Sequence, residues 1–179
     1  FREETVARRT AFELRKARER AHILCGLAVA VSNVDEVVAT IRSSADPAEA
    51  RRRLMERRWP AEDIADYLRL IDDPEHPINE DGTYNLSETQ ARAILDLRLQ
   101  RLTALGVKEV ADELAELAGK ITDYLEILRS RERIMGIISD ELREVRELFA
   151  TPRRTEIVEH EGEVEDDDLI EREDMVVTV

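Results

Sequence analysis

Aromatic side chains are scarce in this sequence of 179 residues. Three phenylalanines, three tyrosines and one tryptophan make up 4% of the chain, while charged residues make up 38%. That composition suits long helices with charged outer faces better than a compact β-sheet core. The first prediction is therefore an all-α protein.

The sequence also has few features of a secreted or membrane protein. Cys25 is the only cysteine, so no internal disulfide can form, and a single thiol fits a reducing cytoplasm. The longest apolar run, residues 23–31, is far shorter than the roughly 20 residues that cross a bilayer. No signal peptide is visible and no initiator methionine is present. We expect a piece of a longer, cytoplasmic protein that has no membrane partner.

Residues for catalysis, cofactor binding or metal binding are not recognisable. His22, His76 and His160 are far apart in the sequence, and Cys25 has no second cysteine, so there is no zinc-binding pattern. A glycine-rich phosphate loop and a serine nucleophile elbow are absent as well. The acidic pair at residues 72–73 is the kind of feature that is usually just solvated. We predict no catalytic residue, no cofactor and no metal site in this stretch.

Negative charge is concentrated near the C-terminus. The formal net charge is −14, and residues 156–174 hold 11 carboxylates against one arginine, a local charge of −10. The rest of the chain is therefore nearly balanced. The acidic stretch has no hydrophobic periodicity and is typical of a flexible linker, and residues 175–179 (MVVTV) predict the start of a β-strand.

Two long stretches have the periodicity of a coiled coil. Apolar residues recur at alternating spacings of three and four over residues 14–31 and again over residues 107–128. The stretches flank a compact insert and belong to helices of similar length, so we predict an antiparallel pair with the insert at its far end. Residues whose numbers sum to about 150 would then lie side by side. A polar residue on the returning seam, with Ser130 and Gly136 beside it, predicts a bend near residue 130 and a candidate hinge.

This register would bring basic residues together at the open end of the pair. Arg8 and Arg9 would lie near Phe149, just before Arg153 and Arg154. One interpretation is a solvated helix face whose charge is balanced by neighbouring glutamates. The other is a positive surface where the helix pair joins a body that handles DNA.

The insert ends in a helix that the sequence predicts for residues 87–106. Ser87 and Gln90 have the spacing of a capping box, and Gly106 provides a stop. Apolar residues cover roughly 200° of the helix surface, too wide an arc for a helix that covers one core and then faces water. The helix is either an ordinary buried one, or one side of it meets a second copy of the chain. In the second case the dimer contact is formed by Leu95, Arg98, Leu99 and Leu102.

These patterns together predict a long antiparallel coiled coil capped at its far end by a small helical globule, followed by an acidic linker and the start of a β-strand. The predicted order is an outgoing helix (1–42), a helical cap with the dimer helix (43–106), a returning helix (107–150), the linker (151–174) and the first strand of a following C-terminal domain (175–179).

Four stretches resemble a known family. Residues 8–24 (RRTAFELRKARERAHIL) resemble the start of the coiled-coil arm in the A subunits of bacterial DNA gyrase, a type IIA topoisomerase. Residues 90–103 (QARAILDLRLQRLT) are similar to the helix at the far end of that arm. Residues 153–157 (RRTEI) and 173–179 (EDMVVTV) resemble the exit from the arm and the first strand of the domain that follows. The order of the four stretches is that of the family.

The resemblance implies an arm and a dimeric exit gate in an enzyme that passes one DNA duplex through another. The implied whole enzyme performs ATP-dependent negative supercoiling, requires ATP and Mg²⁺, and has two A and two B subunits bound to DNA. The implied self-contact is a homodimer through the arm tip. The catalytic residues of the family lie outside this stretch, so no residue here inherits a chemical role.

Three alternatives stay open at this point. The arm in the A subunit of topoisomerase IV shares the fold, although residues 153–179 look more like gyrase. A non-enzymatic coiled-coil dimerisation scaffold would show the same periodicity. A DNA-binding module in its own right is disfavoured by the acidic tail.

Overall fold

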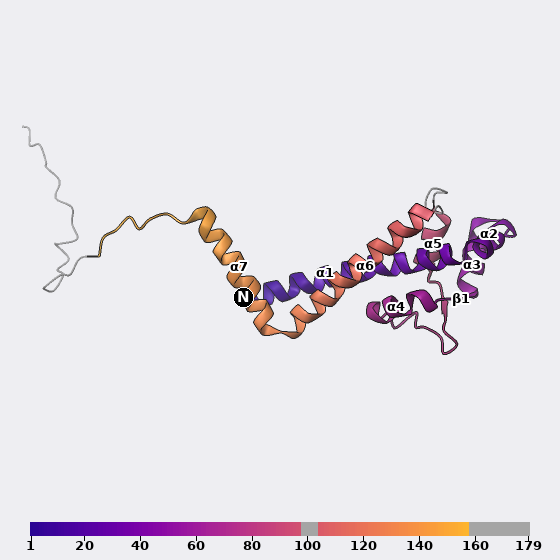
Figure 1. Cartoon of the computed structure of the whole chain (residues 1–179), viewed down its shortest axis with the longest axis horizontal. Coiled ribbons are helices and arrows are strands. Elements are labelled where there is room, and N and C mark those ends of the chain that lie inside the picture. Colours follow the sequence, from indigo (N-terminus) through magenta and orange to yellow (C-terminus); the bar gives the residue numbers. More distant parts are fainter. Residues whose placement is uncertain (98–103, 158–179) are drawn as a thin grey trace, which may run out of the picture. The chain divides into compact units, whose positions relative to one another are not determined.

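The computed structural model describes residues 1–97 and 104–157 (Figure 1). Most of these residues are helical, which confirms the predicted all-α class. In chain order the elements are α1 (Arg2–Ser32), α2 (Val34–Arg42), α3 (Pro47–Glu56), β1 (Arg58–Pro60), η1 (Glu62–Ile64), α4 (Ala65–Ile71), β2 (Thr83–Asn85), α5 (Glu88–Leu95), α6 (Ala104–Arg129) and α7 (Arg131–Phe149). Contacts divide the chain into two units, Phe1–Arg143 and Glu144–Val179.

Helices α1 and α6 run side by side in opposite directions (Figure 1). The side chains buried between and around them include members of both predicted seams: Leu14, Ala17, Ala21 and Leu24 from α1, and Val110, Leu114 and Ile121 from α6. The small alanines let the helix backbones approach closely. The antiparallel pairing therefore agrees with the sequence pattern, whereas coiled-coil packing as such stays a prediction.

The predicted register is wrong along α1 and α6, although Arg9 of α1 and Glu141 of α7 form an ion pair whose numbers do add up to 150. Arg20 forms an ion pair with Glu113 at 2.7 Å, and Glu3 forms one with Arg131 at 2.7 Å. The numbers of these partners add up to 133 and 134, not to about 150. The cause is a bend in the outgoing helix, which ends sooner than the apolar pattern indicates.

That bend lies at Asn33, between α1 and α2, and turns the helix axis by 91°. Asn33 has φ −121° and ψ 37°, and its side-chain Nδ2 donates to the carbonyl of Val29 at 2.9 Å. Asp35 and Glu36 then occupy the first turn of α2, where carboxylates favour a new helix start. A single outgoing helix over residues 1–42 is therefore incorrect.

The predicted dimer helix also ends early. Helix α5 stops at Leu95, with Asp96 as its C-terminal cap residue, and Gly106 lies inside α6 instead of ending a helix. Apolar residues continue on both sides of Asp96 with helical spacing, so the pattern does not reveal this end. The capping box at Ser87 and Gln90 is confirmed.

The insert contains a small sheet that the sequence pattern does not predict. Strands β1 and β2 pair antiparallel, with Trp59 opposite Tyr84. Both aromatic side chains are fully buried, and the Trp59 indole donates to the carbonyl of Leu54 at 2.9 Å. Three-residue strands are too short for an alternating pattern to be recognised. The sheet anchors the insert to the core that α1 and α5 form.

A break between α6 and α7 falls at Ser130, as the sequence predicts. The Ser130 hydroxyl accepts a hydrogen bond from the backbone N–H of Arg133 at 3.2 Å and so caps α7. Beyond the break, Ile134 and Ile138 form a separate small core with Val6 and Ile127. The helix pair is therefore closed at the N-terminal end of α1 by its own apolar cluster.

The end of the chain is only partly described. Residues 151–157 lack regular secondary structure, and the rest of the predicted linker and the predicted strand at 175–179 lie outside the described residues. No single helix in the described ranges is long and apolar enough to cross a membrane; α1 and α2 meet such a criterion only when taken together across their bend.

Candidate functional site

Only one of the four predicted dimer-contact residues can be placed. Leu95 is the last residue of α5, is half-buried and packs against the main core. Arg98, Leu99 and Leu102 lie outside the described residues. The dimer contact therefore stays a prediction.

The first turn of α5 is held by a network around Gln90. The Gln90 side chain is fully buried and its Oε1 accepts from the backbone N–H of Ser87 at 2.9 Å and from the Tyr84 hydroxyl at 3.2 Å. Its Nε2 donates to the carbonyl of His22 in α1 at 2.6 Å. The Ser87 hydroxyl in turn accepts from the Gln90 backbone N–H at 3.2 Å. One side chain therefore completes the capping box and also ties α5 to α1.

A glycine makes this contact possible. A Cβ added at Gly26 would lie 2.6 Å from both Cβ and Cγ of Gln90. Cys25, beside it, is completely buried, and burial raises the pKa of its thiol to about 12. The thiol therefore stays protonated and is a packed core group.

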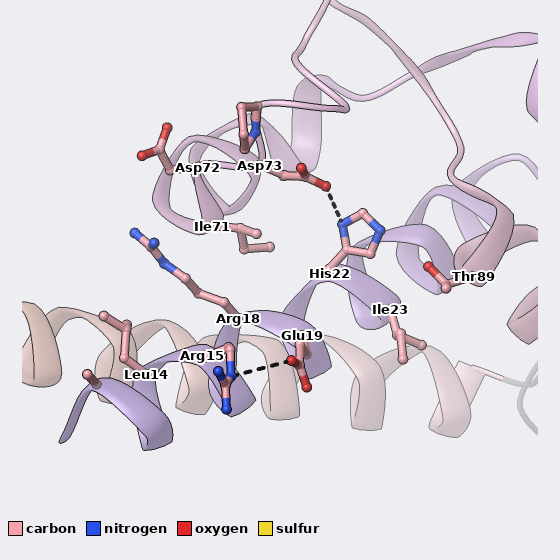
Figure 2. A pocket seen from close by; sticks show the side chains of 12 residues that line it. Leu14, Arg15, Arg18, Glu19, His22, Ile23, Ile71, Asp72, Asp73 and Thr89 are labelled. Atoms are coloured by element: carbon pink, nitrogen blue, oxygen red, sulfur yellow. Dashed lines mark ion pairs between the residues drawn. The ribbon is translucent and has the colours of Figure 1, made fainter. Parts of the chain in front are cut away.

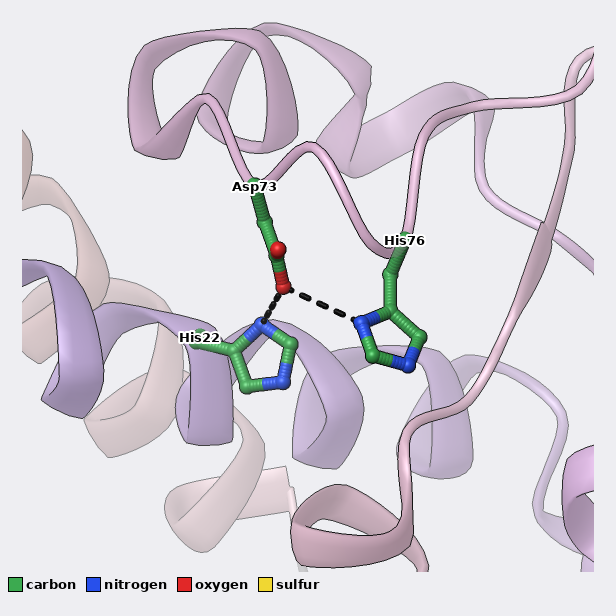
Figure 3. A group of neighbouring side chains, drawn as sticks. All are labelled: His22, Asp73 and His76. Carbon is green, nitrogen blue, oxygen red and sulfur yellow. Dashed lines mark hydrogen bonds and ion pairs between the residues drawn. The ribbon is translucent and has the colours of Figure 1, made fainter.

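Two histidines that are far apart in the sequence meet in space. His22 lies in α1, and Asp73 and His76 lie in the loop after α4. The potential ligand atoms of these three residues all lie within 4.8 Å of one another (Figure 3). Asp73 Oδ2 lies 3.3 Å from His22 Nδ1 and 3.1 Å from His76 Nδ1. The separation of these histidines in the sequence therefore does not reflect their positions in space, because the loop after α4 folds back onto α1.

The electrostatics of this group follow from its half-buried position. Burial lowers the pKa of His22 most strongly; Asp73 opposes this effect and His76 adds to it. Burial alone would raise the pKa of Asp73, but the Glu75 backbone N–H and the two imidazoles hold it below its usual value. At neutral pH the group therefore combines an ionised carboxylate with a neutral His22 imidazole.

A cavity of about 660 Å³ adjoins the group (Figure 2). His22, Asp73 and Thr89 line one part of it, and the side chains of Arg18 and Asp72 line another. Among the described residues, Arg18 Nε is a buried polar atom without a hydrogen-bond partner. The cavity gives small ligands access to the His22 and Asp73 side chains.

The predicted basic cluster divides between the two units. Arg8 lies 4.0 Å from Glu4, and Arg9 pairs with Glu141 at 2.6 Å. Both arginines belong to the unit Phe1–Arg143, whereas Arg153 and Arg154 belong to the other. Arg8 and Arg9 fit the interpretation of a solvated, balanced face, and the grouping of all four stays a prediction.

The two candidate hinge residues differ in their surroundings. Ser130 lies at the break between α6 and α7, whereas Gly136 lies inside α7. Within the described ranges, no atom lies within 4 Å of a Cβ built at Gly136. The break is observed; its use as a hinge stays a prediction.

Comparison with known proteins supplies the family context. Residues 1–143 match the family model for the A subunit of DNA gyrase and topoisomerase IV. The chain is 48% identical to the DNA gyrase A subunit of Rickettsia bellii and 49% identical to that of Granulibacter bethesdensis, over all of its own length and 20% and 19% of theirs. It is 46% identical to the Haemophilus influenzae protein of the same name, over 99% of its own length and 21% of that relative. The chain thus spans about a fifth of the length of these relatives.

Proposed function

Because the chain belongs to the family of DNA gyrase and topoisomerase IV A subunits, we propose that it is the arm and the dimeric exit gate of a type IIA DNA topoisomerase. Two such arms meet at their tips, and the transported duplex leaves when the contact opens. The arm contributes no chemistry, and cleavage and ATP hydrolysis take place in other parts of the enzyme.

The observation that carries this proposal is the antiparallel pairing of α1 and α6 around a compact insert. Residues 98–103, which include Leu99 and Leu102, lie in the sequence between the insert and α6. Helix α5 is the last element of the insert before them. Helix α5 is fixed to α1 by the buried Gln90 network. A rigid mounting of this kind suits a contact that must re-form in the same geometry after each opening.

The relatives favour the gyrase member of the family. The three relatives compared above are all A subunits of DNA gyrase, and similarity to them extends beyond residue 143 to the C-terminal end of this chain. We therefore infer that the whole enzyme supercoils DNA negatively with ATP and Mg²⁺, in an assembly with the gyrase B subunit and DNA. A scaffold without an enzyme is the weaker interpretation, because periodicity alone supports it.

The experiment is to measure the mass of the 179-residue chain by light scattering at concentrations on the order of tens of micromolar. We expect a dimer for the wild type and a monomer for Leu99→Asp, because an unpaired carboxylate is costly in an apolar contact. The matched control is Leu142→Asp, the same substitution at a side chain that is 45% exposed on α7. Circular dichroism checks that both variants fold.

A monomeric wild type would contradict the proposal, as would a dimeric Leu99→Asp variant. If Leu142→Asp also lost the dimer, the dimer contact would have to be assigned to α7 instead of the tip, and the proposal would be contradicted.

A further inference from the structure

The His22, Asp73 and His76 group has the chemistry of a metal site. Imidazole nitrogen and carboxylate oxygen together are the ligands of Zn²⁺ and similar divalent transition metals. Mg²⁺ and Ca²⁺ instead prefer sites built from oxygen. Figure 3 shows both rings turning a nitrogen toward the same carboxylate oxygen.

The distances in the group fit tetrahedral coordination. Metal–ligand bonds of about 2.0–2.1 Å at tetrahedral angles place neighbouring ligand atoms roughly 3.3 Å apart. Asp73 Oδ2 lies 3.3 Å from His22 Nδ1 and 3.1 Å from His76 Nδ1. Two edges of the required tetrahedron are therefore already close to their final length.

The residues behind the group hold it in the orientation that a metal needs. The second ring nitrogen of His22, Nε2, lies 2.7 Å from the Ser87 hydroxyl, and that hydroxyl is fixed by the α5 capping box. The other carboxylate oxygen of Asp73, Oδ1, accepts from the Glu75 backbone N–H at 3.0 Å. Outer contacts of this kind set the ring orientation in metal sites. Here they turn His22 Nδ1 and Asp73 Oδ2 toward each other, and an ion would take the place of the direct contacts between the nitrogens and the carboxylate.

The group is also accessible to an ion from solution. Its side chains are 14%, 27% and 28% exposed for His22, Asp73 and His76, and the cavity beside it is open to water (Figure 2). Asp72, Asp73 and Glu19 on the cavity wall outnumber the two arginines there, Arg15 and Arg18.

We propose that His22, Asp73 and His76 bind one divalent transition-metal ion of the Zn²⁺ type, with a water from the cavity as the fourth ligand. The ion clamps the loop after α4 onto the middle of α1, and its role is structural. The proposal rests on this group alone and does not depend on the arm acting as a gate.

The test is calorimetric titration of Zn²⁺ into the full 179-residue chain after removal of metal with a chelator. We expect saturation at one ion per chain, a thermal midpoint that rises with Zn²⁺ concentration, and no response to Mg²⁺. Co²⁺ used as a spectroscopic probe should show the intense visible bands of a tetrahedral site. His76→Ala and Asp73→Asn should each weaken Zn²⁺ binding by at least about tenfold.

Two matched variants control for unspecific binding. Asp72→Asn alters the neighbouring carboxylate of the same cavity, and His160→Ala removes the remaining histidine of the chain; both should bind Zn²⁺ like the wild type. Absence of Zn²⁺ binding by the wild type would overturn the proposal. Binding that survives both His76→Ala and Asp73→Asn, or that disappears with His160→Ala, would place the ion elsewhere and overturn it equally.

Discussion

Gln90 joins three segments of the chain through a single amide group. It completes the cap of α5, accepts from Tyr84 in β2 and donates to α1 at His22. A fully buried amide must have its hydrogen bonds satisfied, and here Ser87, Tyr84 and His22 provide partners for both ends of the amide. The position of α5 on α1 therefore depends on how closely the α1 backbone can approach this side chain.

The first prediction concerns the close contact between Gly26 and Gln90. Gly26→Ala should destabilise the chain by about 1–3 kcal/mol, because the new Cβ would lie 2.6 Å from two carbon atoms of Gln90 that cannot move away. The measurement is urea denaturation followed by circular dichroism.

Gly119→Ala is the matched control. This glycine lies in α6, and apart from its chain neighbours and the nearby backbone of α6 no atom of the described residues comes within 4 Å of a Cβ built there. Alanine should stabilise the helix by about 0.5–1 kcal/mol, since glycine loses more backbone entropy on folding. If both substitutions stabilised the chain, the close contact at Gly26 would be disproved.

Residues that act through local spacing could be predicted from the sequence, and residues that meet through the fold could not. Ser87 and Gln90 are three positions apart, so their capping box is visible in the sequence. His22 and Asp73 come from different elements, and no spacing rule connects them. Only the return of the loop after α4 onto α1 brings them together, and that return depends on tertiary packing.

At the scale of elements, some helix ends could be predicted from the sequence and others could not. The break at Ser130 is predicted because a polar residue interrupts the seam. The bend at Asn33 and the end of α5 at Leu95 are not, because apolar residues continue beyond both with helical spacing. Val37 lies beyond the bend and is buried in the main core. Its apolar character therefore reflects the packing of α2 on that core and not a continuation of the seam of α1. The order of the helices and their antiparallel pairing were predictable; their register was not.

The break at Ser130 leads to a prediction about α7. Ser130→Ala should destabilise the chain by about 1 kcal/mol, because it removes the hydroxyl that accepts from the Arg133 backbone N–H. Thermal denaturation followed by circular dichroism measures the effect.

Thr122→Ala provides the comparison for this change. Thr122 is exposed within α6 and its hydroxyl bonds only to the carbonyl of Ala118 in the same helix. Alanine has the higher helix propensity, so stability should stay the same or rise by a few tenths of a kcal/mol. An equal loss in both variants would mean that Ser130 has no special role as a cap.

At the scale of the whole molecule, the distribution of charge argues against an independent DNA-binding module. Several basic side chains of α1 are matched by carboxylates: Arg9 by Glu141, Arg20 by Glu113 and Lys16 by Glu19. Residues 156–174 add a local charge of −10. Affinity for DNA grows with the number of phosphates that basic groups neutralise, and paired groups contribute little. In the unit Phe1–Arg143, these ion pairs therefore reduce the positive charge that is available for contact with DNA.

The last prediction tests the tip in the complete enzyme. An uncompensated buried charge costs about 3–5 kcal/mol, and each 1.4 kcal/mol changes an equilibrium about tenfold. If Leu99 lies in the dimer contact as we propose, Leu99→Asp should weaken gate closure by at least about 100-fold.

The full-length protein carrying this change, assembled with the gyrase B subunit and ATP, should lose negative supercoiling in a plasmid assay. It should still cleave DNA, because in our proposal the arm supplies no chemical group. The full-length Leu142→Asp variant should supercoil normally, since that side chain is exposed on α7. Normal supercoiling by the Leu99→Asp variant would remove Leu99 from the gate, whereas joint loss of cleavage and supercoiling would point to a folding defect upstream of the gate.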